Sequence, residues 1–376
     1  MATTHRLARV AVFALEDTAV QVVWGDAPVA PLNVTVGPRA THLGGYGRPG
    51  GVLVTGLEPT TRYDVVVESG AGDVVRLGCR TLPSPEGELL STVACLSDLH
   101  VGSTRQGWFG TMRDRSGLPE PAPLRCARAA LDEAVAWGPD LVVVKGDLTE
   151  RGRAPEWRAV TPLLQEVAVP LAICPGNHDT LEGRDHEPAE VLGAAGLACA
   201  APVDVVDLPG VRVVIVDSTA PGRSPGTIRR ALPDLLDALA EADRPALVCL
   251  HHPFEPLPVP TQYPVGIPWP ESWRALRKIH RVKRDVVIST GHTHRNRRLH
   301  FGHVAQAEVA AVKDYPGVWA GYAVHEGGIR QVVRRVTAPE AMGWTEYTRL
   351  TFGGVWRGYA PGLRSHRCYV LRWPGP

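Results

Sequence analysis

The spacing of apolar positions changes once along the chain, near residue 89. Residues 6–82 carry short alternating or apolar runs, such as "VQVVWGD", "GVLVTGL" and "YDVVVES". Glycine, proline, asparagine and aspartate separate these runs, and no helical period is present. Short strands at this spacing predict a small all-β sandwich in the N-terminal region.

From residue 89 onward, apolar runs alternate with amphipathic segments of helical period. The predicted strands are "LSTVACLS", "DLVVVKG", "PLAICPG", "VRVVIVDS", "ALVCLHH" and "DVVISTGH", and helices are predicted at 122–138, 154–168, 228–242 and 271–280. Strands that are apolar at nearly every position lie buried on both faces of a sheet. The pattern therefore predicts an α/β layered fold, whose ligand site lies beyond the carboxyl ends of the strands. Strands expected between 304 and 336 should build a second sheet.

The N-terminal region resembles a fibronectin type III module. The resemblance rests on "WGD" and on "GLEPTTRYDVVVES", within about one module of chain. It implies a tryptophan that fills the core of the sandwich and a tyrosine corner near the start of a late strand. The matching positions are Trp24, Leu57, Pro59, Thr60 and Tyr63.

Four segments follow from these patterns. We expect a fibronectin-like sandwich at 1–83, a linker at 84–89 that overlaps the proline-bearing "TLPSPEGE" (81–88), the α/β domain at 90–336 and an extension at 337–376. The extension is rich in tryptophan and tyrosine, which rarely stay in water. We therefore expect it to pack on the body of the protein.

The composition of the chain gives expectations about binding partners and about the cellular compartment. The 376 residues include 40 Lys and Arg against 39 Asp and Glu, so a net charge of +1 gives no general attraction to nucleic acid or acidic membrane. No apolar run is long enough to span a bilayer, and the first residues lack the apolar core of a signal peptide. Three of the seven cysteines, Cys95, Cys174 and Cys249, lie in apolar runs, which predicts reduced thiols and the cytosol.

Polar side chains follow five of the predicted strands directly. They are Asp98 and His100, then Asp147, then Asn177, His178 and Asp179, then His251 and His252, and last His292 and His294. Residues i and i+2 of an extended segment face the same way, so Asp98 with His100, and His292 with His294, can each face one common site. Imidazole and carboxylate donors favour Zn, Mn, Fe or Co over Mg. The set is too large for one ion and would suit two, about 3.5–4 Å apart and bridged by a carboxylate.

Each segment alone has an ordinary structural explanation. An aspartate after a strand is commonly a helix cap or a turn residue, and a pair of histidines is commonly satisfied within the fold. Five such segments in succession, each at the end of a strand, are not explained in this way.

The ordered set D-x-H, G-D, G-N-H-D, H-x-P and G-H-x-H resembles the calcineurin-like metallophosphoesterase family over residues 90–335. The resemblance implies a four-layer α/β/β/α sandwich with two metal ions. The first ion would take Asp98, His100, Asp147 and His294, and the second would take Asp147, Asn177, His251 and His292. His251 is preferred to His252 because the family's ligand stands two places before the proline, here Pro253. For His252 we favour a packing or supporting role. His178 would face the substrate phosphate, and Asp179 would hold its imidazole.

Such a centre implies the hydrolysis of a phosphoester by a hydroxide that bridges the ions. Two divalent ions with Asp98 and Asp147 leave a net charge of +2, which attracts a phosphate. We expect Mn, Fe or Zn, with Mg or Co possible, and a small phosphodiester as the substrate. A phosphomonoesterase or a nuclease with the same centre is the alternative. A binding protein with an inert centre is disfavoured because every expected ligand is present.

Comparison of subfamilies favours a phosphodiesterase. Purple acid phosphatases carry a tyrosine where this chain has Glu150, and a glycine where it has His100. "SDLHVG" with "GDLTERG" is more similar to the cyclic-nucleotide phosphodiesterase branch. The basic runs 277–285 and 295–298 are the best candidates for nucleic-acid contact, but charge runs are usually solvated. We expect a small partner, such as a nucleotide, and neither nucleic acid nor membrane.

Two long loops carry no motif and are candidates for substrate selection. They cover residues 102–123 and 253–270, and the second contains seven prolines. Their aromatic residues Trp108, Tyr263 and Trp269 could stack on a nucleobase, or could merely anchor the loops to the body. The sequence leaves both interpretations open.

Overall fold

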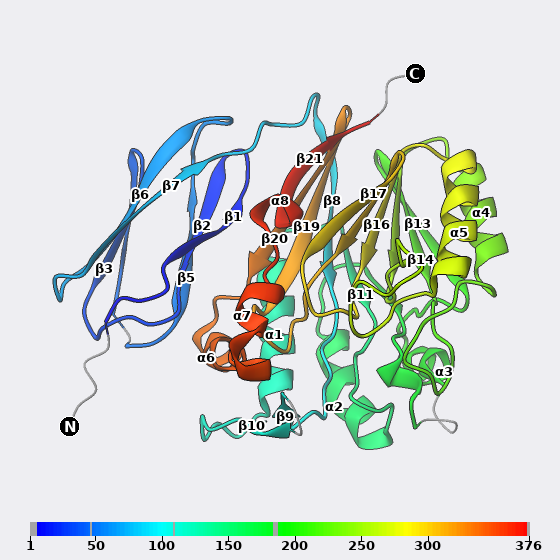
Figure 1. The fold of residues 1–376 in the computed structure, drawn as a ribbon, viewed down its shortest axis with the longest axis horizontal. Helices are drawn as coiled ribbons and strands as arrows, with labels where there is room; N and C mark the ends of the chain where they lie inside the picture. Colours follow the sequence, from blue (N-terminus) through cyan, green and yellow to red (C-terminus); the bar gives the residue numbers. More distant parts are fainter. Residues whose placement is uncertain (1–5, 46, 108–109, 183–186, 374–376) are drawn as a thin grey trace.

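The computed structural model describes residues 6–45, 47–107, 110–182 and 187–373. An all-β region at the N-terminus lies to one side of a larger α/β body (Figure 1). Within the described ranges, no helix is both long enough and apolar enough to cross a membrane.

The N-terminal region is a sandwich of two antiparallel sheets. One sheet has the order β1-β2-β5 and the other β4-β3-β6-β7. Their strands are β1 (Ala11–Leu15), β2 (Ala19–Trp24), β3 (Leu32–Val36), β4 (Arg39–Leu43), β5 (Gly50–Thr55), β6 (Arg62–Ser69) and β7 (Val74–Arg80). Trp24 is buried in the core, as predicted. The predicted tyrosine corner is also present, because the hydroxyl oxygen of Tyr63 accepts a hydrogen bond of 2.9 Å from the Glu58 amide.

The body contains two six-stranded sheets. The first has the order β12-β11-β8-β19-β20-β21, and the second has the order β13-β14-β15-β16-β18-β17. The strands of the first sheet are β8 (Leu89–Leu96), β11 (Leu141–Lys145), β12 (Leu171–Cys174), β19 (Val318–His325), β20 (Gly328–Arg335) and β21 (Cys368–Arg372). Those of the second are β13 (Val203–Leu208), β14 (Val211–Val216), β15 (Ala246–Leu250), β16 (Val286–Thr290), β17 (Arg297–Phe301) and β18 (Val304–Glu308).

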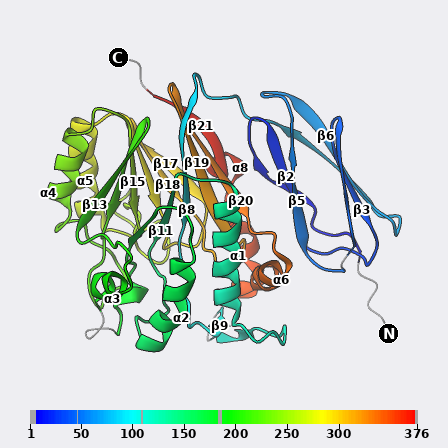
Figure 2. The ribbon, with the colours of Figure 1, turned by 180° about the vertical axis from the view of Figure 1, so that it is seen from behind.

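Helices cover the outer faces of both sheets, which confirms the predicted four layers. The helices α1 (Ala122–Ala136), α2 (Ala154–Gln165) and α6 (Pro339–Thr348) lie against the first sheet (Figure 2), and their buried side chains share a core with it. Those of α4 (Leu232–Ala240) and α5 (Trp269–Val282) pack on the second. Short helices α3 (Pro188–Ala194), α7 (Trp356–Tyr359) and α8 (Arg364–Arg367) complete the set.

The main core lies between the two sheets. Val93 and Cys95 of β8 face this core, whereas Ala94 and Leu96 face the helices, so the strand is apolar on both sides because both sides are covered. All seven cysteines are free, as predicted, and the sulfurs of Cys95 and Cys249 lie 3.9 Å apart across the two sheets.

The prediction for residues 304–336 was wrong in its strand pairing. Only β18 of this region belongs to the second sheet, where it runs parallel to β16. The hairpin of β19 and β20 belongs to the first sheet, where β19 runs antiparallel to β8. These strands are buried on both faces, so their apolar pattern does not distinguish one partner strand from another. In addition, β21 pairs with β20 and extends the first sheet.

Partly buried ion pairs join the N-terminal sandwich to the body. The carboxylate of Glu16 accepts a hydrogen bond of 3.0 Å from Nε of Arg334, and it lies 3.5 Å from Nη2 of Arg330. Asp17 pairs with Arg330 as well. The side-chain amide of Gln21 bonds both backbone groups of Arg335, at 2.8 and 2.9 Å.

We predict that Glu16→Ala lowers the free energy of unfolding by about 2 kcal/mol, because it leaves the partly buried guanidinium of Arg334 without its carboxylate partner. Urea or thermal unfolding of the whole chain measures the effect. Glu68→Ala, an exposed change on β6, is the control and should stay within about 0.5 kcal/mol of wild type. Equal stability of the two variants would contradict the prediction.

Candidate metal centre

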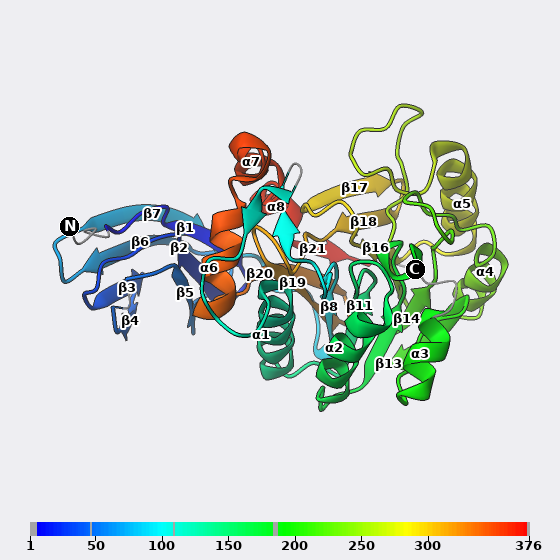
Figure 3. The same cartoon turned by 90° about the horizontal axis from the view of Figure 1, so that it is seen from below.

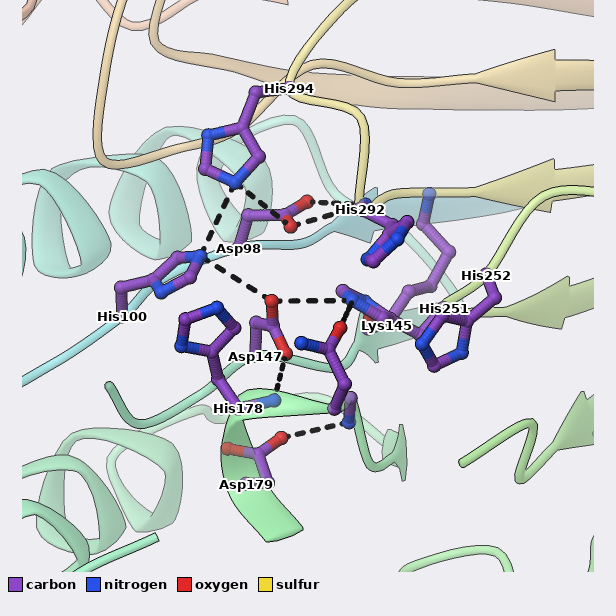
Figure 4. A network of polar contacts seen from close by, with 12 residues as sticks. Asp98, His100, Lys145, Asp147, His178, Asp179, His251, His252, His292 and His294 are labelled. Atoms are coloured by element: carbon purple, nitrogen blue, oxygen red, sulfur yellow. Dashed lines mark hydrogen bonds and ion pairs between the residues drawn. The ribbon is translucent and has the colours of Figure 1, made fainter. Parts of the chain in front are cut away.

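The five polar segments predicted from the sequence lie together at the carboxyl ends of strands from both sheets. Three segments follow β8, β11 and β12 of the first sheet, and two follow β15 and β16 of the second. The strands in each group are parallel neighbours, so their carboxyl ends reach the same side of the body (Figure 3). The side chains point toward one another between the two sheets (Figure 4).

The backbone of this cluster is unusual. Among the described residues, eight that are not glycine have positive φ, and five of them are Asp98, His100, Asp147, His292 and His294, with φ between 46° and 70°. This left-handed region is costly for residues with a Cβ, and such strain concentrates at functional sites. The observation is independent of any motif and points to the same residues.

Glycines in these segments permit close approach of the backbones. A Cβ on Gly176 would lie 2.3 Å from both the amide nitrogen and Oδ1 of Asp147. A Cβ on Gly146 would lie 2.8 Å from Cγ of His251, and its φ is +77°. The G-D and G-N-H-D patterns therefore need glycine before their polar residues, because a larger residue would push the segments apart.

One group of donors surrounds the space between His100 and His294. Their Nε2 atoms lie 3.3 Å apart, and Nε2 of His294 is 3.4 Å from Oδ1 of Asp98. The opposite ring nitrogens are both held by carboxylates: Nδ1 of His100 donates to Glu150 at 3.0 Å, and Nδ1 of His294 donates to Asp314 at 2.8 Å. This arrangement directs two Nε2 lone pairs at one point. Metal-binding histidines are commonly oriented in this way, by a carboxylate that accepts a hydrogen bond from the other ring nitrogen.

A second group of donors lies on the other side of Asp147. Nε2 of His251 is 3.2 Å from Oδ2 of Asp147 and 3.2 Å from Oδ1 of Asn177. Its Nδ1 donates to the carbonyl oxygen of Lys145 at 2.8 Å. Nε2 of His292 donates a hydrogen bond of 3.0 Å to the carbonyl oxygen of Val265. The lone pair of Nδ1 is therefore the one that can bind a metal ion.

Asp147 lies between the two groups, because its Oδ2 is also 3.4 Å from Nε2 of His100. It is buried, with 2% of its surface exposed. Four overlapping sets of three donors in this cluster have ligand atoms within 4.8 Å of one another. The central position of Asp147 is the geometry that a bridging carboxylate requires.

The protonation of these groups suits metal binding. Burial lowers the pKa of His100 to about 4, aided by the charge of Lys313, and burial with His251 lowers the pKa of His292 to about 3. Burial opposes ionisation of Asp98 and Asp147, but the surrounding histidines outweigh it and hold both pKa values below the usual range. Neutral imidazoles and ionised carboxylates are the forms that bind metals. His100, His292, Asp98 and Asp147 therefore have the protonation state that a divalent ion needs. Burial alone would lower the pKa values of His251 and His294, but Asp147 and Asp314 raise them, so these two imidazoles must lose a proton before they bind an ion.

His252 has a different environment from His251. Its Nδ1 lies 2.9 Å from Oγ of Ser218, and its ring packs against that of His292 with 4.6 Å between centroids. Nε2 has no hydrogen-bond partner among the described residues. These contacts agree with the packing role that we favoured from the sequence, although His252 also lies within reach of His251 and His292.

The role predicted for Asp179 was wrong in one respect. Nδ1 of His178 donates to the carbonyl oxygen of Glu150 at 2.7 Å, not to Asp179. The carboxylate of Asp179 instead accepts bonds from the amides of Thr149, Leu148 and Gly176, and from the Thr149 hydroxyl. Asp179 thus fixes the two loops that carry Asp147 and Asn177.

Sequence reasoning missed three supporting residues. The sequence marks Glu150 only as a departure from the purple acid phosphatases, whereas the structure shows that its carboxylate holds His100. Asp314 belongs to no motif, and only the fold brings it to His294. Lys145 is buried and donates from Nζ to the carbonyl oxygen of Thr290 at 2.7 Å, which ties β11 to β16.

Metal affinity should depend on pH through His251. Burial disfavours its charged form, but Asp147 outweighs burial and raises the pKa of His251 to about 9. A proton on Nε2 competes with a metal ion, so affinity should fall as the pH falls below 9, by roughly 100-fold from pH 8.5 to 6.5. Titration against a chelating indicator with Mn or Zn measures this dependence. A flat profile over this range would show that His251 does not bind the ion.

Asp314→Asn should weaken metal binding by roughly 10- to 100-fold, because the carboxylate that orients His294 is lost while the ligands remain. The same titration at pH 8 measures it. Asp204→Asn on β13, the edge strand of the second sheet, serves as the control because its carboxylate bonds the neighbouring Val205 amide, and it should bind metal as wild type does. An unchanged affinity in Asp314→Asn would remove the support for His294 as a ligand.

Comparison with known proteins agrees with the geometry. The chain is 28% identical over 158 residues to a probable cyclic nucleotide phosphodiesterase of Synechococcus sp., covering 42% of this chain and 58% of that protein. It is 30% identical to the glycerophosphodiester phosphodiesterase GpdQ of Enterobacter lignolyticus (42% and 56% covered). It is also 30% identical to the 3',5'-cyclic adenosine monophosphate phosphodiesterase CpdA of Pseudomonas aeruginosa (35% and 47% covered). The matches thus span about half the length of these curated relatives.

A family model described as calcineurin-like phosphoesterase matches residues 91–296, which is more than half of the chain and includes all five polar segments. The two-sheet sandwich and the cluster between its strand ends are what the resemblance in the sequence implied. The chain belongs to the calcineurin-like phosphoesterase family.

Proposed function

We propose that this protein is a dinuclear metal-dependent phosphodiesterase that hydrolyses a small phosphodiester. The observation that carries the proposal is the position of Asp147, whose one carboxylate oxygen faces a histidine of each donor group. Asp98, His100 and His294 with Asp147 would hold the first ion. Asn177, His251 and His292 with Asp147 would hold the second. Mn, Fe or Zn suit these donors best.

Two bound divalent ions would supply positive charge to the phosphate and would lower the pKa of water at the centre. The protein holds the ligand side chains in position. It neutralises only part of the charge of the two ions, because Asp98 and Asp147 are the two carboxylates among the proposed ligands. The remaining charge of about +2 favours an anionic phosphoester over a neutral ester.

His178 is proposed to contact the substrate phosphate. It is partly exposed, and its ring meets that of His100 edge to face with 4.5 Å between centroids. Because Nδ1 is bonded to the Glu150 carbonyl, Nε2 is the atom left to act. When protonated, Nε2 can donate to a phosphate oxygen or give its proton to the departing alkoxide.

A small substrate is favoured over nucleic acid. The basic run 277–285 lies mostly on α5, on the outer face of the second sheet rather than among the ligands. In the run 295–298, the guanidinium groups of Arg295 and Arg297 already bond to the side chains of Glu308 and Gln262. The named phosphodiesterase activities of the relatives support a diester over a monoester. The cytosol stays our prediction for the compartment.

Hydrolysis of bis-p-nitrophenyl phosphate and p-nitrophenyl phosphate tests the proposal. The protein is stripped of metal and resupplied with Mn, Fe, Zn or Mg, one at a time. We expect metal-dependent turnover that favours the diester. A preference for the monoester would indicate a phosphatase, and absence of turnover with every metal, together with no bound metal by elemental analysis, would reject the proposal.

Asp147→Asn and His251→Ala should each reduce metal-dependent turnover by more than roughly 100-fold, because each removes a proposed ligand. Loss of a residue that only orients a ligand usually costs 10- to 100-fold. Circular dichroism should show the fold retained. His300→Ala, an exposed histidine on β17 outside the cluster, is the matched control and should keep full activity. Activity near the wild-type rate in either ligand variant would refute the site assignment.

A further inference from the structure

The proline-rich loop at 253–270 supports both imidazoles of the second donor group. It begins two residues after His251, and the carbonyl oxygen of Val265 within it accepts the hydrogen bond of 3.0 Å from Nε2 of His292. The rings of His251 and His292 lie close together, with 5.1 Å between centroids (Figure 4). The position of this loop therefore bears directly on how His292 faces the centre.

A buried carboxylate holds the same part of the loop. Oε1 of Glu255 accepts a hydrogen bond of 2.9 Å from the amide of Gly266, and Glu255 is only 2% exposed. The Gly266 amide and the Val265 carbonyl belong to one peptide group, which is planar and rigid. One end of this group is thus held by Glu255, and the other end meets His292.

Neighbouring contacts leave this peptide group little freedom. A Cβ on Gly266 would lie 2.1 Å from the carbonyl oxygen of Pro253, so the loop closes on itself without space for a side chain. Glu255 also accepts a hydrogen bond of 3.0 Å from Nε2 of Gln262. Oε1 of Gln262 in turn accepts one of 2.9 Å from Arg295, directly after the last proposed ligand. The loop is therefore fastened to the segment that carries the ligand histidines.

Packing alone does not explain Glu255. Its Oε2 is buried and has no hydrogen-bond partner among the described residues. A buried polar atom without a partner costs about 1–3 kcal/mol, and such an atom calls for a reason beyond packing. Orientation of His292 through the loop supplies that reason.

The first long loop, at 102–123, supports the other donor group in a similar way. It contains β9 (Arg105–Gln106), which pairs with β10 (Met112–Arg113). Nε2 of Gln106 donates to Asp314 at 2.7 Å, and Asp314 holds His294. Each long loop thus supports one of the two donor groups.

For the aromatic residues of these loops, neither interpretation from the sequence is confirmed. Tyr263 is 82% exposed, and Trp269 begins α5 on the outer face of the second sheet. Trp108 lies outside the described residues.

We infer that Glu255 is a positioning residue for the second metal ion. Through the peptide group between Val265 and Gly266, its carboxylate holds the Nε2 side of His292 in place and so keeps Nδ1 directed at the centre. The inference rests on the proposed two-ion function and adds a residue outside the five polar segments. Residues that orient a metal ligand usually change affinity 10- to 100-fold, and the peptide group between Glu255 and His292 places the effect near roughly 10-fold.

Calorimetric titration of the metal-free protein with Mn tests the inference. His292→Ala identifies the binding step of the second ion, and Asp314→Asn identifies that of the first. Glu255→Met, which removes the acceptor at similar side-chain length, should weaken the second step roughly 10-fold and leave the first unchanged. Glu255→Gln keeps an acceptor oxygen for Gly266 and should bind both ions as wild type does.

A second readout needs no bound ion. In the metal-free protein at pH 8, heteronuclear NMR of the histidine side chains shows which ring nitrogen carries the proton. We expect His292 to hold its proton on Nε2 in wild type, because the Val265 carbonyl accepts it. Glu255→Met should populate both tautomers of His292, and Glu255→Gln should keep the single one.

A matched control separates positioning from a general loss of stability. Glu133 on α1 also holds loop amides, those of Thr337 and Ala338, at 2.7 and 3.1 Å. Glu133→Met should therefore cost similar stability but leave both binding steps and the His292 tautomer unchanged. If Glu255→Met does not fold, Glu255→Asp takes its place, because the shorter side chain draws the carboxylate away from Gly266.

Equal weakening of both steps by the Glu255 variant, or weakening of neither, would overturn the inference and leave the two-ion centre intact. A single His292 tautomer in that variant would overturn it as well. If wild-type protein binds fewer than two Mn ions, the proposed function fails, and the inference fails with it.

Discussion

The structure depends on the buried carboxylate of Asp147, which lies where the strand ends of two sheets meet. A buried charge without partners costs several kcal/mol, so both sheets must bring compensating groups to it. The first sheet brings His100 and the second brings His251, each within 3.4 Å. Lys145, two residues earlier, strengthens this junction: its carbonyl oxygen holds His251, and its ammonium bonds β16 at Thr290.

This junction explains why the segments around it are strained. Five proposed ligands adopt left-handed backbone conformations, and Gly146 and Gly176 leave no room for a Cβ. Such conformations persist only where the surrounding fold enforces them. Here the two packed sheets, the Asp179 carboxylate that gathers the loop amides and the carboxylates behind His100 and His294 do so together. The same rigidity would keep donors in place before any ion binds, which lowers the cost of assembling the centre.

Much of the fold and the site could be predicted because the pattern is local. Apolar strands, helical periods and the residues directly after the strands can all be recognised within short stretches of sequence. The polar residues found in this way do meet in space: Asp98, His100, Asp147, His251, His292 and His294. Contacts between distant segments could not be predicted. The partner of β19, the support of His294 by Asp314 and the bond of His178 to the Glu150 carbonyl arise only from tertiary packing. Asp179 was misassigned for this reason.

Anomalous diffraction from crystals grown with Mn or Zn would show whether Asp147 bridges two metal ions. We expect two ions about 3.5–4 Å apart, with Asp147 bound to both, with His100 and His294 at one ion and with His251 and His292 at the other. A single ion in this cluster, or a pair that Asp147 does not bridge, would contradict this expectation.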